Sequence, residues 1–398
     1  MEYFLMNKNT PVLSFQIEKD KLSDLKVTET GRFHAPLPIG YFNIREFLDG
    51  RRAPKHRQHI EKLLKSCGCY QLDGFVDVTH ALSLNDTFWV KRADQKLGWN
   101  QVSLYQNKFD ETIAHIAFEG GLYGEQFSTT SPEFSTDGTY AKCWIQEGKK
   151  TYLIKKGSEN FRNAGMEPYS EYYSSKVAEL LCPHMVEYDL AHYRGAVVTK
   201  CELFTTEKIG FIPFHKVVDP QMVKSISAEE IQSIYAKYDS LEDFNRMLVL
   251  DSLVLNEDRH LGNHGFLIDN ESQDIIRMSP VFDLNVTLLP YAEKEDFQGI
   301  DEYIKEKGPR IGADFVKPAQ AVMTSAIQAE LINMKDFRFE QHPSCPYPEW
   351  RLEAINQLLG CQIRAILDMP SYYYETAKTK KEKQPIIPEE GYQLERER

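Results

Sequence analysis

The segment from Leu255 to Asn263 constrains this chain more than any other, because it sets an aspartate and an asparagine at a fixed spacing. Asp258 and Asn263 follow a helical pattern and precede a strand-like run, and a second aspartate, Asp283, comes after the next short apolar run. Phosphoryl transfer from ATP uses one carboxylate as the base for the attacking hydroxyl, and an amide oxygen and a further carboxylate as metal ligands. The three side chains match these roles, so the sequence predicts a kinase.

The spacing of Asp258 and Asn263 is common by itself, and its context makes it informative. The run 266–268 and the run 275–277 predict a hairpin between Asn263 and Asp283, which would bring both residues to one end of the same ribbon. The plainer interpretation is that Asp258 and Asn263 only shape a loop and that Asp283 opens a helix. His260 is either a catalytic acid or base or a brace of the loop, and we favour the brace, since the neighbouring Asp258 already supplies a base.

Composition excludes some classes of function. The chain has 398 residues and a formal net charge of −12, and this length predicts two or three domains. The charge argues against nucleic acid or an anionic membrane as the main partner, because both bind basic surfaces. We expect a cytoplasmic protein, because there is neither a signal peptide nor an apolar run of the about 18 residues that a membrane helix needs. The seven cysteines lack zinc-site spacing.

The order of the expected elements predicts an α+β protein with a bilobal, protein-kinase-like fold. Residues 1–125 form a mixed α/β accessory region, 126–203 a small β-rich N-lobe, 204–375 a larger helical C-lobe, and 376–398 a charged tail. Hydrophobic periodicity and turn residues predict the individual elements. We expect hairpins at 4–6/12–17, 139–145/151–155 and 266–268/275–277, a strand ending at 91, a strand at 196–199, helices at 53–66, 169–181, 317–334 and 349–367, and helices opened by capping boxes at Ser227 and Ser240.

A kinase also needs a cation for the phosphates and an acid that orients it. Lys155 and Lys156 end a predicted strand, where side chains alternate between faces, so one points into the cleft and the other into solvent. Lys155 is our choice and Lys156 the alternative. Glu171, at the start of the next helix, is the expected acid partner, with Glu179 as the alternative.

A turn that could cover phosphates precedes the lysine strand. Ser135, Thr136, Asp137 and Gly138 supply two hydroxyls, a glycine and backbone N–H groups. The turn is neither a Walker loop nor a glycine-rich G-x-G-x-x-G loop, and taken alone it is an ordinary turn.

These segments resemble the HipA-like kinase family, which comprises bacterial serine/threonine kinases with a protein-kinase-like fold, some of them toxins of toxin–antitoxin systems. The resembling segments cover about 131–290, and they are Ser135–Lys142, Leu153–Lys155, Ser170–Tyr172, Asn256–Phe266 and Ser279–Asp283. We match no part of residues 1–125 to the family's N-terminal subdomain.

The resemblance implies roles for particular residues, with ATP and Mg²⁺ as cofactors. It makes Asp258 the catalytic base, Asn263 and Asp283 the Mg²⁺ ligands, and Lys155 a phosphate contact oriented by Glu171. It also implies that the segment linking the lobes binds adenine through its backbone, and here that segment is Lys200, Cys201, Glu202 and Leu203. Autophosphorylation of the phosphate loop, which silences members of the family, would fall on Ser135 or Thr136.

The expected function is therefore an ATP- and Mg²⁺-dependent serine/threonine protein kinase, a toxin-like regulator limited by autophosphorylation. Its partners would be a protein substrate with a Ser or Thr acceptor and an antitoxin-like protein, with no direct nucleic acid and no membrane. Two alternatives stay open. The Asp-Arg-His string at Asp258 also resembles phosphoinositide-kinase loops, which suggests a lipid or small-molecule phosphotransferase, and a non-catalytic nucleotide-binding regulator is the third class.

Overall fold

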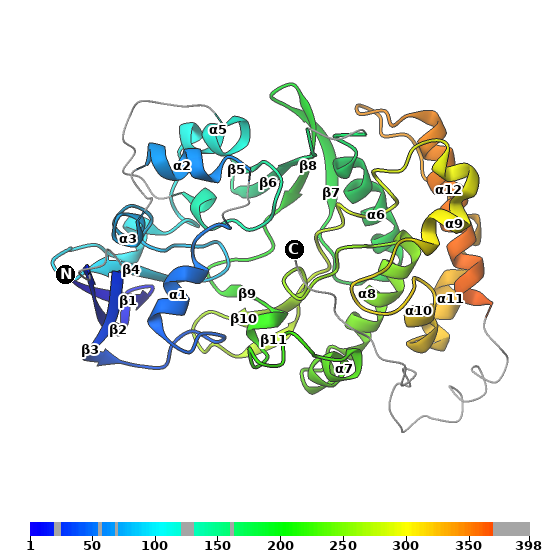
Figure 1. Ribbon diagram of the computed structural model, residues 1–398. Coiled ribbons are helices and arrows are strands. Elements are labelled where there is room, and N and C mark those ends of the chain that lie inside the picture. Colours follow the sequence, from blue (N-terminus) through cyan, green and yellow to red (C-terminus); the bar gives the residue numbers. More distant parts are fainter. Residues whose placement is uncertain (20–24, 55–57, 68–70, 121–130, 160–162, 369–398) are drawn as a thin grey trace. The chain divides into compact units, whose positions relative to one another are not determined.

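A computed structural model describes the chain except for residues 20–24, 55–57, 68–70, 121–130, 160–162 and 369–398 (Figure 1). The chain folds into two compact units. Unit 1 consists of Met1–Lys156, Glu202–Ile212 and Leu267–Ile275, and unit 2 of Gly157–Cys201, Pro213–Phe266 and Ile276–Arg398. The predicted tail at 376–398 lies outside the described residues.

Unit 1 is built on an antiparallel sheet in the order β3-β2-β1-β4. Its strands are β1 (Glu2–Asn7), β2 (Thr10–Lys19), β3 (Leu25–His34) and β4 (Phe88–Arg92). Alternation along β1 sends Leu5 and Phe4 into different apolar clusters, as expected for a strand covered on both faces. The helices of this unit are α1 (Ile44–Gly50), α2 (Ile60–Ser66), α3 (Leu72–Thr79), α4 (Trp99–Val102) and α5 (Glu111–Glu119).

A hairpin follows in the same unit. A short 3₁₀ turn, η1 (Pro132–Phe134), precedes β5 (Lys142–Glu147) and β6 (Lys150–Lys156), which pair antiparallel. Gly148 makes the turn with φ +62°, a conformation that glycine adopts without strain. The register sets Lys142 directly opposite Lys155. The two lysine side chains therefore leave the hairpin on the same face.

Unit 2 is mainly helical. Helix α8 (Leu241–Val254) contacts α6 (Glu167–Leu181), α7 (Ala228–Lys237), α10 (Lys317–Ala321) and α12 (Glu349–Leu367), and it lies among them in Figure 1. Every residue of α8 from Phe244 onward is buried, which is typical of a central helix. The remaining elements are the hairpin β7 (Tyr188–Tyr193) and β8 (Ala196–Glu202), strand β9 (Ile209–Pro213), the hairpin β10 (Gly265–Asp269) and β11 (Ile275–Met278), η2 (Phe214–Lys216), η3 (Asp296–Gly299), α9 (Ile300–Lys305), α11 (Ser325–Asn333) and η4 (Met334–Asp336).

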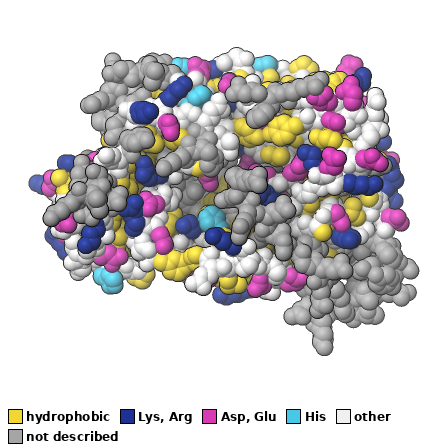
Figure 2. Space-filling view, in the orientation of Figure 1, with side chains coloured by type: hydrophobic (Ala, Val, Ile, Leu, Met, Phe, Trp, Pro, Cys, Tyr) yellow, Lys and Arg dark blue, Asp and Glu magenta, His cyan; other side chains and the backbone are white. Residues whose placement is uncertain are grey.

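The unit boundaries cut through some of these strands, so that Glu202 of β8, most of β9 and part of the β10–β11 hairpin belong to unit 1. Charged side chains of both signs stand side by side on the face shown in Figure 2. None of the helices in the described part is long and apolar enough to cross a membrane.

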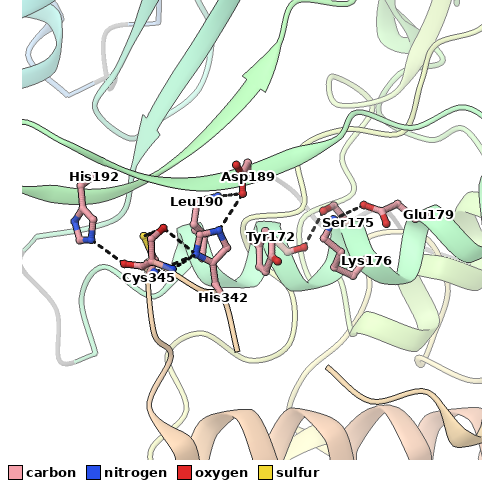
Figure 3. A network of polar contacts seen from close by, with 10 residues as sticks. Tyr172, Ser175, Lys176, Glu179, Asp189, Leu190, His192, His342 and Cys345 are labelled. Carbon is pink, nitrogen blue, oxygen red and sulfur yellow. Dashed lines mark hydrogen bonds and ion pairs between the residues drawn. The ribbon is translucent and has the colours of Figure 1, made fainter. Parts of the chain in front are cut away.

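A polar network fastens the loop before α12 to β7 and α6 (Figure 3). His342 Nε2 lies 3.0 Å from Asp189 Oδ1, and its Nδ1 accepts the backbone N–H of Cys345 at 3.0 Å. An Nδ1 that accepts from the backbone leaves the proton on Nε2, so the imidazole donates to Asp189. The ring also stands edge-on to Tyr172 of α6. One ring nitrogen binds β7 and the other binds the loop itself, so the histidine has a structural role.

Most of the elements predicted from the sequence are confirmed. All three hairpins are present, as are the helices at 169–181 and 349–367, and Ser227 caps α7 in a capping box with Glu230. Ser240 precedes α8, but its hydroxyl accepts the N–H of Met278 instead of capping the helix.

Other elements differ from the prediction. The helix expected at 317–334 is two helices, because the Thr324 hydroxyl caps a new start at Ile327 N–H. The helix expected at 53–66 begins only at Ile60, because His59 before it is in the left-handed region with φ +66°; residues 53, 54, 58 and 59 are not helical, and 55–57 lie outside the described residues. The helices α1, α3 and α5 and the strand β3 were not predicted.

Candidate active site

The predicted base lies in a tightly braced loop after α8. Leu255 ends the helix in the left-handed region, with φ +52°. The Asn256 side chain then donates to Asp251 at 2.8 Å and accepts the N–H of Asp258 at 3.0 Å. The side chain of Asp258 is 36% exposed. The fold therefore fixes the backbone of Asp258 and leaves its carboxylate within reach of a substrate.

Arg259 joins the two stretches of chain that carry the predicted site. Its guanidinium binds both oxygens of Asp251 at 2.9 Å, and its Nη1 donates to the carbonyls of Asn263 at 2.9 Å and Phe282 at 2.8 Å. The residue is 1% exposed, so these bonds form away from water, where they hold most strongly. Arg259 thus fastens the loop of Asn263 to the residue that precedes Asp283.

Asn263 presents an oxygen to the site. Its Nδ2 donates to the backbone carbonyl of Asp258 at 2.7 Å, which fixes the direction of the amide. Its Oδ1 is buried and has no hydrogen-bond partner among the described residues. An oxygen buried without a donor costs free energy unless a ligand satisfies it. The donor set suits Mg²⁺, which prefers oxygen ligands.

Asp283 is held at the same place by its backbone. It has φ +59°, a left-handed conformation that is uncommon for residues other than glycine, and its N–H donates to the hydroxyl of Tyr188 at 3.0 Å. The residues before it are tied to residues 184–186, because the Val281 N–H donates to the His184 carbonyl at 3.0 Å and the Val186 N–H donates to the Val281 carbonyl at 2.9 Å. Asp283 is therefore constrained from β7 as well as by Arg259.

The electrostatics show that the two carboxylates share one region. Burial raises the pKa of Asp258 above its ordinary value, the charges of His260 and Arg310 lower it, and the charge of Asp283 raises it again. His260 also braces the loop, because its Nδ1 accepts the N–H of Gly262 at 3.0 Å. In the described residues no group of three or more His, Cys, Asp or Glu side chains could hold a metal. That the Asn263 amide and Asp283 together hold a metal stays a prediction.

Glu171 is buried in α6 and lies in unit 2, with the two aspartates. Its Oε2 accepts the Thr199 hydroxyl at 2.6 Å. The alternative, Glu179, forms an ion pair with Lys176 at 2.5 Å and is 39% exposed. Lys155 lies in unit 1, so its pairing with Glu171 stays a prediction.

Unit 1 carries the predicted cation and the predicted loop. Lys155 is buried, whereas Lys156 is half-buried and lies 5.8 Å from the ring centroid of Phe118. Lys142 was not predicted as a site residue. It is also buried, and its ammonium donates to the Asp137 carbonyl at 2.7 Å. The pair places two positive charges directly opposite each other on one face of the hairpin. The sequence feature that could have identified Lys142 is its position opposite Lys155 in the hairpin, and this register depends on where the turn lies.

The predicted phosphate loop, residues 135–138, is held by hydrogen bonds of its own. Gly138 has φ +97° and its N–H donates to the Asp137 carboxylate at 2.7 Å. The Thr136 hydroxyl donates to the Pro132 carbonyl at 2.7 Å and accepts from the Trp144 indole at 2.8 Å. Among the residues that the structure describes, the Ser135 hydroxyl makes only a long bond of 3.4 Å, also to the Pro132 carbonyl. The two hydroxyls therefore differ in how firmly they are held.

The expected adenine segment is divided between the units. Lys200 and Cys201 belong to unit 2, and Glu202 and Leu203 to unit 1. The N–H of Leu203 donates to the Thr151 carbonyl at 2.9 Å, and Glu202 pairs with Lys150 at 2.6 Å. One of the expected backbone donors is thus already engaged, and adenine binding by the other residues stays a prediction.

Comparison with known proteins identifies the family. The HipA-like C-terminal domain matches residues 134–335, which is just over half of the chain. The serine/threonine-protein kinase CtkA of Helicobacter pylori is 28% identical over 154 residues, which is 36% of this chain and 47% of CtkA. The chain therefore spans about half the length of that relative.

Two solved structures were also found. The crystal structure of CtkA has a TM-score of 0.45 and 18% identity, and covers 62% of this chain and 94% of its own. The toxin–antitoxin structure of HipA, HipB and operator DNA from Shewanella oneidensis has a TM-score of 0.52 and 12% identity, and covers 92% of this chain and 100% of its own.

The second of these likenesses extends into residues 1–125, because the unmatched 8% is far smaller than that region. No part of these residues could be matched to the family from the sequence, although the likeness in fold reaches into them. The predicted α+β, protein-kinase-like fold is confirmed. With its HipA-like domain, its fold and the braced Asp258, Asn263 and Asp283, the chain belongs to the HipA-like kinase family.

Proposed function

We propose that this protein is an ATP- and Mg²⁺-dependent serine/threonine protein kinase. The observation that carries the proposal is the bracing by Arg259, which binds the carbonyls of Asn263 and Phe282 and so joins the base loop to the Asp283 segment. Membership of a family with kinase-like relatives supports it.

In the proposed reaction, Asp258 accepts the proton of a serine or threonine hydroxyl. The hydroxyl oxygen forms a bond to the γ-phosphorus of ATP, the bond from that phosphorus to the bridging oxygen breaks, and ADP leaves with the electron pair. Lys155 and Lys142 bind phosphate oxygens, and Asn263 Oδ1 and the Asp283 carboxylate hold Mg²⁺. The bound Mg²⁺ supplies positive charge that neutralises the phosphates.

The direct test uses radiolabelled ATP with a candidate protein acceptor or a cell lysate. We expect transfer of label by the wild type and a loss of about 10²–10⁴-fold in Asp258→Asn, because a general base contributes about that much. ATP binding should persist in this variant, since the base acts on the acceptor. Normal phosphorylation by Asp258→Asn would show that another group is the base.

We also infer that the phosphate loop is a site of autophosphorylation, and that Ser135 is the acceptor. The Thr136 hydroxyl is held by two short hydrogen bonds, whereas that of Ser135 has one long bond. Phosphopeptide mapping after incubation with ATP should find phosphate on Ser135, and Ser135→Ala should remove it while Thr136→Val does not. Phosphate on Thr136, or none on the loop, contradicts this assignment.

A toxin-like role with an antitoxin-like protein partner is a further part of the proposal. Its support is the fold likeness to the structure of HipA with HipB and operator DNA. Affinity purification of the full chain from its own host, followed by mass spectrometry, should recover one stoichiometric protein. Recovery of the chain alone at native expression counts against this part.

A further inference from the structure

The segment between α9 and α10, residues 306–316, lies against the base loop, and we call it the strap. Its second half is anchored. Ile311 and Phe315 are buried, and the Asp314 carboxylate accepts the N–H groups of Val316 and Lys317 at the start of α10. Gly312 has φ +110°, and a Cβ there would lie 2.3 Å from the ring of Pro318. The strap therefore has a fixed course.

Two ion pairs join the strap to the base loop. Arg310 Nη2 lies 3.0 Å from Oδ1 of Asp258, and Lys307 Nζ lies 3.5 Å from Oε2 of Glu257. The Asp258–Arg310 pair is about one-third exposed on both sides. Such pairs are screened by water and contribute little to stability. Its main consequence is therefore local, because it decides how the Asp258 carboxylate is turned.

We propose that Arg310 is a positioning residue for the reaction: it holds Oδ1 of Asp258 so that Oδ2 faces the acceptor hydroxyl. The inference rests on the proposed role of Asp258 as the base. Oδ2 accepts no hydrogen bond from the part of the chain that the structure describes. The strap thus adds a third stretch of chain to the site, beyond the loop of Asn263 and the Asp283 segment. A carboxylate turned away from the acceptor loses catalysis without losing nucleotide, since small errors of orientation slow the chemical step.

The experiment compares the wild type with Arg310→Ala, Arg310→Lys and a control, Lys317→Gln. Lys317 lies at the end of the strap in an exposed ion pair with Asp314, so its variant makes the same change of charge without touching Asp258. We expect Arg310→Ala to lower kcat by about 10–100-fold, a part of what a general base contributes. The Kd for Mg·ATP and the KM for the acceptor should change less than about twofold. Lysine should restore part of kcat, and low concentrations of guanidinium ion should restore part of it in Arg310→Ala.

A purely structural strap would behave differently. Loss of activity in Arg310→Ala that neither lysine nor guanidinium restores, or a kcat equal to that of the wild type, overturns the inference. Circular dichroism and the Tm of Arg310→Ala separate misfolding from loss of catalysis, and Arg310→Lys repeats the test with the charge retained. If the wild type transfers no phosphate, the proposed function is wrong. If the wild type is active and Arg310→Ala has the same kcat, only the role of Arg310 is wrong.

Discussion

Arg259 is the residue on which the candidate site most depends. It is buried, its charge is balanced by the carboxylate of Asp251, and its remaining donors bind two carbonyls from different stretches of chain. Burial alone would lower the pKa of this guanidinium, but the nearby Asp251 charge outweighs it and the pKa is raised. The arginine therefore stays charged and keeps the site assembled.

Arg259→Ala should destabilise the protein by about 3–5 kcal/mol, because it leaves the buried carboxylate of Asp251 without its partner. The midpoint of urea unfolding measures the loss. The control is Arg45→Ala, which breaks an exposed pair with Asp49 and should cost about 0–1 kcal/mol. Equal midpoints for the two variants would mean that Arg259 does not brace the site.

Tyr188→Phe tests the support of Asp283. It removes the hydroxyl that accepts the Asp283 N–H, and partners of metal ligands commonly change metal affinity by about 10–100-fold when they are lost. We expect the Kd for Mg·ATP, measured by calorimetry, to rise about tenfold. Tyr3→Phe removes a hydroxyl bonded to Asp77 in unit 1 and should leave that Kd unchanged. The same Kd for Mg·ATP in both variants would show that Tyr188 does not support Asp283.

At the scale of elements, the hairpin of β5 and β6 and the turn before it carry the residues that we propose bind the phosphates. The turn at 135–138 brings the Asp137 carbonyl onto the Lys142 ammonium, and the register sets that lysine opposite Lys155. A Cβ on Gly138 would lie 2.1 Å from the Lys142 ammonium. The positive φ of +97° favours glycine here, and an added Cβ would also displace the Lys142 ammonium.

Gly138→Ala should weaken ATP binding about tenfold, equivalent to about 1.4 kcal/mol, because it strains the turn and displaces Lys142. Gly148→Ala is the matched control. It also has a positive φ, +62°, but nothing lies within 4 Å of an added Cβ. Titration with a fluorescent ATP analogue measures both. If Gly148→Ala weakens binding as much as Gly138→Ala, strain alone explains the effect.

The elements also show what could be predicted from the sequence. Asp258, Asn263 and Asp283 could be found because their spacing and the hairpin of β10 and β11 are local patterns. Arg310 could not, because a contact between residues 52 positions apart leaves no periodic signal. Lys142 depended on a strand register, and the separation of α10 from α11 depended on the hydroxyl of Thr324 acting as a cap.

At the scale of the whole molecule, charge distinguishes the proposed kinase from a lipid kinase. The net charge is −12, and on the face shown in Figure 2 basic side chains stand among acidic ones. Attraction to anionic lipid needs a cluster of basic residues, worth about 1 kcal/mol each. We therefore expect no co-sedimentation with phosphatidylserine vesicles at about 0.15 M salt. Sedimentation with these vesicles but not with neutral ones would favour the lipid alternative.

The central claim is that Asn263 and Asp283 hold a divalent cation beside the base, and it can be measured without an acceptor. Electron paramagnetic resonance of Mn²⁺ with a non-hydrolysable ATP analogue reports the metal bound to the protein. We expect a bound Mn²⁺ signal for the wild type and for Asp258→Asn, and Mn²⁺ affinity weakened by at least about tenfold in Asn263→Ala and Asp283→Asn. Undiminished binding of Mn²⁺ and nucleotide in Asp283→Asn would contradict it.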